Sequence, residues 1–290
     1  MVNSLEVVIW DVEHGTAILV NTPTGKRLVI DLGVGSFTNS NKTFSPLKYL
    51  HDSYKVKKLD ALVITHPHGD HIDDIFNLNL VPPGAIYAPR SVDRGLVRDN
   101  NKRKDAAKTE RYFQWLDYAP VNPTKTLGAL TDWGCTISLF HTKYSESNLN
   151  NYSLVTVIGH AGSTILIPGD NEPPSWKLLL DQSAFVSAIK NTNLFVTSHH
   201  GRESGYHADL FTHFKPQLCF LSDTNDIPTS ATNRYTYQAL GAPVFNKGMN
   251  RTETRKTVTT RSDHCIVIKC YTEWDGLANQ NKNLFSVRIN

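Results

Sequence analysis

The segment His66–His71, with the sequence H-P-H-G-D-H, constrains this chain more than any other feature. It follows directly on the apolar run 60–65, which predicts a buried strand. His66 and His68 are two residues apart, so both side chains point to the same side of an extended backbone, and Pro67 keeps the preceding residue extended. Three imidazoles and a carboxylate within six residues are typical of a metal site. Solvent-facing polar residues on a loop are a poor alternative.

The remaining sequence predicts a layered α/β protein. Short runs rich in Val, Ile and aromatic residues, bounded by Gly, Asn, Asp or Pro, are typical of strands. We expect strands at 5–10, 17–20, 27–31, 60–65, 135–140, 153–158, 164–168, 194–197, 218–222 and 265–269. Helices are expected at 45–52, 72–78, 104–116, 175–189, 207–214 and 235–240. No repeat or low-complexity linker interrupts the chain, so we predict one domain, 1–272, and a polar tail, 273–290, with an edge strand at 284–289.

Composition narrows the class of protein. The 290 residues are 40% hydrophobic and 20% charged, which favours a globular chain that buries its own core over a disordered one. A net charge of +3 is compatible with an anionic partner but does not by itself indicate one. We find no signal-peptide pattern and no run near the ~18 to 20 apolar residues that span a bilayer. Four cysteines without a CxxC pair are expected to be reduced, so we expect a cytoplasmic protein with no membrane partner.

Other candidate metal ligands also stand at strand ends. His141, Asp170 and the pair His199-His200 each follow a separate predicted strand, as His66 does. Side chains at strand ends gather at one rim of a layered sheet and are held by rigid elements. Six or seven nitrogen and oxygen ligands are enough for two metal ions, with Asp170 placed to bridge them. The lack of sulfur ligands favours a borderline or hard divalent ion, either Zn²⁺ or Mn²⁺.

The H-x-H-x-D-H string resembles the metal motif of the metallo-β-lactamase superfamily. Six further strings resemble, in the same order, those of the hydrolase domain of ComEC-type competence proteins: D-V-G-Q-G-D-A, D-x-G, N-N-x-S-L-V, T-G-D, H-H-G-S and T-x-x-D-G-x-I. Their counterparts here lie at 10–17, 30–33, 150–155, 168–170, 198–201 and 260–266. The resemblance runs from residue 5 to about residue 270 and implies a four-layer αββα sandwich with the metals at one edge.

The resemblance also implies a ligand set. The first metal would take His66, His68 and Asp170, and the second would take Asp70, His71, Asp170 and one of His199 and His200. His141 stands at the superfamily's usual place for a third histidine of the first metal, although competence proteins often lack it; the alternative is a surface histidine. The other member of the His199-His200 pair would lie beside the substrate as a proton donor or anion contact. The expected catalytic residues are Asp70, Asp170 and His200.

These residues predict hydrolysis. Two metal ions roughly 3.5 to 4 Å apart make a bridging hydroxide available at neutral pH and clamp the attacked centre. His68 in place of Glu, by resemblance, argues against the superfamily's oxygen-reducing di-iron branch. We expect a phosphodiesterase or nuclease whose partner is an anionic substrate, a nucleic acid or nucleotide. The alternatives are a lactone or thioester hydrolase and a non-catalytic, metal-stabilised binding module.

Supporting roles are predicted for five further residues. Asp31 would orient a ligand histidine, or else be a turn aspartate. Asn150, Asn151 and Ser153 could contact substrate, although an Asn-rich turn explains them almost as well. His207 could replace the histidine of a His-Pro pair that competence proteins carry where this chain has 226–230; a helix-surface histidine is the simpler alternative.

Two basic segments remain open to two interpretations. Seven basic residues lie within 93–111, and three lie within 251–256. A solvated surface explains each segment, and a basic lid over an anionic substrate is the alternative. The chain has no counterpart of the competence proteins' membrane channel, so DNA uptake does not transfer to it.

Overall fold

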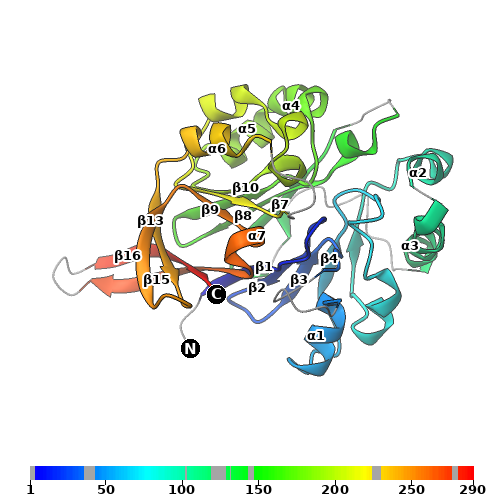
Figure 1. Ribbon diagram of the computed structural model, residues 1–290, viewed down its shortest axis with the longest axis horizontal. Coiled ribbons are helices and arrows are strands. Elements are labelled where there is room, and N and C mark those ends of the chain that lie inside the picture. Colours follow the sequence, from blue (N-terminus) through cyan, green and yellow to red (C-terminus); the bar gives the residue numbers. More distant parts are fainter. Residues whose placement is uncertain are drawn as a thin grey trace.

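The computed structural model describes residues 4–35, 43–101, 103–118, 129–130, 132–142, 147–223, 230–275 and 280–290. Within these ranges two β-sheets face each other, and helices cover their outer sides (Figure 1). The predicted four-layer αββα fold is confirmed. No helix in the described ranges is long and apolar enough to cross a bilayer.

The larger sheet has the strand order β13-β12-β16-β15-β1-β2-β3-β4-β5. Its strands are β1 (Leu5–Ile9), β2 (Ile18–Asn21), β3 (Arg27–Ile30), β4 (Ala61–Val63), β5 (Ile86–Tyr87), β12 (Ala242–Asn246), β13 (Arg251–Arg255), β15 (Ile266–Asp275) and β16 (Gln280–Ile289). β3 and β4 are parallel, with Ile30 opposite Val63. The residues that follow these two strands, Asp31 and the His66–His71 segment, therefore emerge at the same edge.

The smaller sheet has the order β14-β11-β10-β9-β8-β7-β6. Its strands are β6 (Ala129–Leu130), β7 (Thr136–Phe140), β8 (Val155–His160), β9 (Ser163–Ile167), β10 (Leu194–Val196), β11 (Leu218–Leu221) and β14 (Thr257–Thr259). β9, β10, β11 and β14 run parallel to one another. Asp170 and the His199-His200 pair follow β9 and β10, so parallel pairing brings them to one edge.

Helices cover the two outer faces. α1 (Pro46–Asp52), α2 (Arg94–Asn100) and α3 (Ala106–Tyr118) lie over the larger sheet, and α4 (Pro173–Leu180), α5 (Ser183–Ile189) and α6 (Thr232–Gln238) lie over the smaller one (Figure 1). α7 (Thr260–Asp263) is a single turn. The 3₁₀ turns are η1 (Ile75–Leu80), η2 (Arg103–Asp105), η3 (Leu149–Tyr152), η4 (Ser198–Gly201), η5 (Glu203–Gly205) and η6 (Ala208–Thr212).

Three buried clusters hold these layers together. One lies between the sheets, and the other two lie between each sheet and its helices. The alternation of β1 shows the pattern: Leu5, Val7 and Ile9 belong to the cluster between the sheets, whereas Val8 packs toward the helices. The four cysteines are free thiols, three of them buried, which agrees with the expected reduced state.

The expected edge strand in the tail is wrong in its position. The strand exists as β16, but it lies between β12 and β15 and pairs with both. The boundary expected at 272/273 falls inside β15, which pairs with β16 along its whole length. Residues 276–279 lie outside the described part. The helix expected at 72–78 is the 3₁₀ turn η1, and the one at 175–189 is divided into α4 and α5.

Candidate metal centre

The candidate site lies where the two sheets present their strand ends. The His66–His71 segment comes from the larger sheet, and Asp170 and the His199-His200 pair come from the smaller one. Gly169 makes this approach possible, because its φ is +63° and an added Cβ would lie 2.7 Å from Cβ of Thr65. A larger residue there would separate the two loops.

Asp170 is the centre of the cluster. Its Oδ2 lies 3.2 Å from Nε2 of His200, 3.4 Å from Nε2 of His71, and 3.9 Å from Nε2 of both His66 and His199. The carboxylate is almost fully buried. Segments that are far apart in sequence therefore converge on one carboxylate oxygen, as the strand-end pattern predicted.

Ligand-type atoms fall into two geometric groups. His66, His71 and Asp170 form one, and Asp70, His71 and His200 form the other, with the atoms of each group within 4.8 Å of one another. His71 belongs to both. This division differs from the set implied by the resemblance, in which Asp170 alone is shared. His68 stands outside both groups, although its Nδ1 is 2.9 Å from Nε2 of His66.

Buried oxygens orient the histidines of the cluster. Asp31 accepts from the backbone N–H and the hydroxyl of Thr65, and its Oδ2 lies 2.8 Å from Nδ1 of His71. The Ser153 hydroxyl lies 3.2 Å from Nδ1 of His66 and accepts from the backbone N–H of Asp170. Each of these contacts leaves Nε2 of the histidine facing the cluster, which is the arrangement that metal-binding histidines need.

The His-His pair is held by an unusual backbone. His199 and His200 have φ values of 49° and 56°, and Gly201 has 79°. Left-handed conformations at non-glycine residues cost about 1 to 3 kcal/mol each and persist where the surroundings enforce them. Here the backbone N–H of His199 donates to the carbonyl of Gly169. The turn directs His200 into the cluster, and it leaves His199 at its margin beside Glu172, 3.2 Å away.

The charges of the cluster are strongly coupled. Burial acts to raise the pKa of Asp170, but His200 and His71 outweigh it and hold that pKa well below its usual range. Burial acts to lower the pKa of His71, but Asp170, Asp31 and Asp70 together raise it well above its usual value. Burial lowers the pKa of His66, and the positive charge of His71 lowers it further. Without a cation the cluster therefore pairs a buried carboxylate with a protonated imidazole.

The donor set fits a divalent metal ion. Nδ1 of His200 is buried and has no hydrogen-bond partner among the described residues, and Nε2 of His71 and of His200 have only the carboxylates of the cluster beside them. Buried polar atoms are rarely left unpaired in native proteins. Imidazole nitrogens and carboxylate oxygens are the donors that Zn²⁺ and Mn²⁺ accept.

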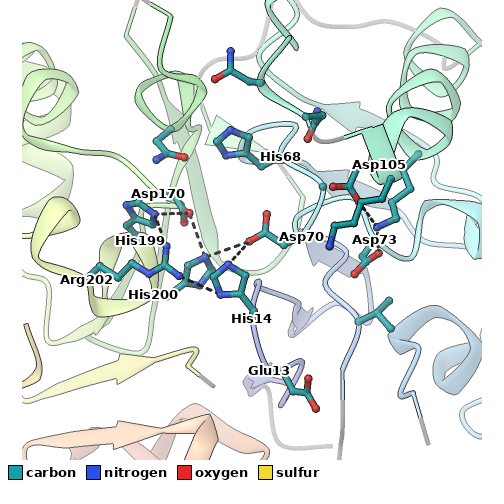
Figure 2. Close-up of a pocket in the computed structure, with 17 residues that line it drawn as sticks. Glu13, His14, His68, Asp70, Asp73, Asp105, Asp170, His199, His200 and Arg202 are labelled. Carbon is teal, nitrogen blue, oxygen red and sulfur yellow. Dashed lines mark hydrogen bonds and ion pairs between the residues drawn. The ribbon is translucent and has the colours of Figure 1, made fainter. Parts of the chain in front are cut away.

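A polar pocket of about 460 Å³ opens onto the cluster (Figure 2). The residues lining it are Glu13, His14, Val34, His68, Gly69, Asp70, Asp73, Asn100, Asn101, Lys104, Asp105, Lys108, Asn150, Asp170, His199, His200 and Arg202. Val34 is the one apolar side chain among these described residues.

The α2–α3 segment packs against the backbone of the His66–His71 segment. Asn101 donates to the carbonyl of Pro67, and a Cβ added to Gly69 would lie 2.6 Å from Cγ of Asp105. Lys108 pairs with Asp105, at 2.8 Å, and with Asp73. The segment therefore forms one wall of the pocket.

Most described cations of the basic segment 93–111 do not face the pocket. Arg94 pairs with Asp117, and Arg98 with Glu110, on the exposed surface. Lys104 and Lys108 are the two basic residues of this segment that line the pocket, and Lys102 lies outside the described residues. In 251–256, Arg251 and Arg255 pair with Glu253 on β13.

The other predicted residues lie in different places. Asn150 lines the pocket and donates to Glu172. Asn151 is buried, and its side-chain oxygen accepts from the backbone N–H of Glu172 and from the hydroxyl of Ser175 at the start of α4. The Ser153 hydroxyl lies beneath the site, between His66 and Asp170. Neither His141 nor His207 is among the described lining residues or geometric groups; Nδ1 of His141 lies 3.0 Å from the carbonyl of Thr142. Residues 226–229 lie outside the described part.

The sequence interpretation gave no role to His14, Arg202 or Glu172. Nε2 of His14 lies 3.3 Å from Oδ2 of Asp70, and Arg202 contacts both His14 and His199. The signals were present, because His14 lies within the 10–17 string and Arg202 directly follows the His-His-Gly string. Only the tertiary structure shows that these two strings meet.

Comparison with known proteins identifies the family. The model of the metallo-β-lactamase superfamily matches residues 10–208, more than half of the chain. The chain belongs to this superfamily. It is a metal-dependent hydrolase of this superfamily, and the two His/Asp groups are its candidate metal ligands.

Individual relatives of this metallo-β-lactamase superfamily member are distant. The competence protein ComA of Neisseria gonorrhoeae is 26% identical over 182 residues, which are 56% of this chain and 24% of that protein. The chain thus spans about a quarter of that relative. A structure described as a metal-dependent hydrolase of Parabacteroides distasonis has 13% identity and a TM-score of 0.46, covering 88% of this chain and 93% of that one. A metallo-β-lactamase-type structure from Thermotoga maritima has 16% identity and a TM-score of 0.36, covering 59% and 77%.

Proposed function

We propose that this protein is a metal-dependent phosphodiesterase that acts on a nucleic acid or nucleotide. The observation that carries the proposal is the polar lining of the pocket beside Asp170, where Val34 is the one apolar side chain among the described residues. With two divalent ions bound to offset its carboxylates, such a lining suits an anionic substrate, whereas the acyl chain of a lactone or thioester would gain little from burial there. The match to a competence protein gives further support.

The proposed ligands of two divalent ions, Zn²⁺ or Mn²⁺, are the members of the two geometric groups: His66, His71, Asp170, Asp70 and His200. His68 would complete the set. Of the His-His pair we assign His200 to the metals, because its Nε2 is nearer to Asp170 than that of His199 and because it belongs to one of the two geometric groups. Bound ions would lower the pKa of a coordinated water and stabilise negative charge on the attacked phosphate.

The chain's own residues would orient this chemistry. Asp31 and Ser153 hold His71 and His66 by their Nδ1 atoms, and so aim both Nε2 atoms at the site. His199 would face the substrate. Arg202 can only donate, so Nε2 of His199 accepts from it and the His199 proton is held on Nδ1, toward Glu172. We also propose a reducing, cytoplasmic location, which the four free thiols support.

A substrate panel tests the proposal. Metal-stripped protein, reloaded with Zn²⁺ or with Mn²⁺, is assayed on bis-p-nitrophenyl phosphate, DNA, RNA, cyclic nucleotides, a lactone and a thioester. We expect hydrolysis of at least one phosphodiester, lost on chelation and restored on reloading. Turnover of the lactone or thioester alone contradicts the proposal. Full metal occupancy without any turnover indicates a binding module instead.

A further inference from the structure

Arg202 lines the pocket as a cation without a carboxylate partner among the described residues. Elsewhere on the surface Arg94, Arg98 and Arg234 each pair with an acidic side chain. Arg202 instead contacts two imidazoles: Nη1 lies 3.3 Å from Nε2 of His199, and Nη2 lies 3.4 Å from Nδ1 of His14. Its positive charge is thus held in place without being neutralised.

The two imidazoles act as spacers between Arg202 and the metal cluster. An arginine only donates hydrogen bonds, so the facing nitrogens of His14 and His199 accept. The opposite nitrogen of His14 faces Asp70 at 3.3 Å, and Nε2 of His199 also lies 3.9 Å from Asp170. These contacts use two of the five N–H groups of the guanidinium and leave three for a ligand.

Figure 2 shows where this arginine lies. Arg202, His199, His200 and His14 gather on one side of Asp70, whereas Asp73 and Asp105 lie on the other side. Asp73 and Asp105 are the partners of Lys108, so of the two lysines that line the pocket Lys108 is neutralised. Among the described residues that line the Asp170 side of the pocket, Arg202 is the one arginine or lysine, and no carboxylate pairs with it.

Arg202 and His14 are two of the positions at which this chain differs from the strings that it resembles; the others are Glu13, Thr16, Pro168 and His264. His14 stands where the D-V-G-Q-G-D-A string has Gln, and Arg202 stands where the H-H-G-S string has Ser. The two residues are 188 positions apart and lie in contact. Two of these differing positions therefore meet at one point of the pocket.

We propose that Arg202, positioned by His14 and His199, binds a phosphate group of the substrate beside the metal centre. This inference rests on the phosphodiesterase function proposed above and makes it more specific. A planar guanidinium donates two parallel hydrogen bonds to a phosphate, which gives both affinity and orientation. The bound phosphate is either the attacked one or its neighbour in the chain of the substrate.

The test compares Arg202→Gln, Arg202→Lys and, as a matched control, Arg234→Gln, an exposed arginine paired with Glu203 outside the pocket. The substrates are thymidine 5′-(p-nitrophenyl phosphate) with and without a 3′-phosphate. Loss of a charge-assisted contact should raise KM about 10- to 100-fold in Arg202→Gln while kcat changes much less. Arg202→Lys should recover part of the loss, and metal content and Tm should stay unchanged.

The outcomes distinguish binding of the attacked phosphate from binding of its neighbour, and they distinguish failure of the Arg202 inference from failure of the proposed phosphodiesterase function. A higher KM for both substrates assigns Arg202 to the attacked phosphate, and a higher KM for the 3′-phosphorylated substrate alone assigns it to the neighbour. An unchanged KM for both overturns the inference. If wild-type protein cleaves no phosphodiester, the proposed function fails, and calorimetric titration with inorganic phosphate still decides on Arg202. There we expect at least about tenfold weaker binding in Arg202→Gln, and equal binding contradicts the phosphate site.

Discussion

Nδ1 of His71 lies 2.8 Å from Oδ2 of Asp31, a carboxylate that is fully buried at the end of β3. The same oxygen accepts from the Thr65 hydroxyl, so Asp31 joins two parallel strands beneath the site. This contact fixes which nitrogen of His71 faces the metal cluster. Orientation of a ligand histidine by a buried carboxylate is typical of metal sites.

Asp31→Asn should therefore weaken metal binding about 10- to 100-fold, because the amide no longer stabilises the imidazole in the required tautomer. Competition with a chromophoric chelator measures the affinity, and thermal unfolding of the metal-free protein reports any structural loss. Asp209→Asn, at an exposed carboxylate, is the control. Equal metal affinity in Asp31→Asn and wild type would show that Asp31 does not position His71.

Metal binding should release protons. Burial alone would lower the pKa of His71, but Asp170, Asp31 and Asp70 raise it above its usual value, so the ring is protonated near neutral pH in the metal-free protein. A metal requires the neutral ring, so apparent affinity should rise with pH until the pH passes the raised pKa of His71, by up to about tenfold per pH unit for each proton released. Calorimetry in buffers of different ionisation enthalpy measures the proton count. A binding heat that is independent of the buffer would contradict it.

Lys104 should contribute to the binding of a nucleic acid substrate. It lines the pocket and has no ion-pair partner among the described residues, whereas Arg98 is paired with Glu110 on the surface. In Lys104→Gln we expect KM for a nucleic acid to rise about threefold to tenfold and the slope of log KM against log salt to fall by about one. Arg98→Gln is the control. Equal effects of the two substitutions would show that Lys104 makes no specific contribution to the binding of a nucleic acid.

Gly69 should be essential for the packing of the α2–α3 segment against the His66–His71 segment. A methyl group there would lie 2.6 Å from Cγ of Asp105, which Lys108 holds in place. We expect Gly69→Ala to lower the free energy of unfolding by about 1 to 3 kcal/mol and to weaken metal binding, since overpacking displaces its neighbours. Denaturant titration measures the first effect. Gly248→Ala, whose added carbon meets only ordinary contacts, should change neither.

The sequence predicts the layered fold because its central strands carry a local signal. Apolar runs such as Leu5–Ile9 and Leu218–Leu221 are buried as expected. The hairpin β12–β13 was missed, because Arg251–Arg255 has the sequence RTETR and lies mostly exposed at the edge of the sheet. The position of β16 in the sheet depends on its pairing with β12. No local sequence pattern indicates this pairing, because the fold alone brings the two strands together.

The site was predictable where its residues stand in one short segment or at strand ends. His66, Asp70, His71 and Asp170 converge because parallel strands end at one edge. The contact between His14 and Arg202 was not predictable, because it joins loops of two different sheets. Which member of the His-His pair faces Asp170 depends on a left-handed turn that the residue types do not favour.

The central claim is that one buried carboxylate organises metal binding and hydrolysis. Asp170→Asn keeps the shape of this side chain but removes the charge that lies between His71 and His200. Its metal content by elemental analysis, measured beside its phosphodiesterase activity and beside Asp209→Asn, is the most direct test. We predict loss of at least about half of the bound metal and a fall in kcat of about a thousandfold or more. Wild-type metal content with wild-type activity would contradict the account.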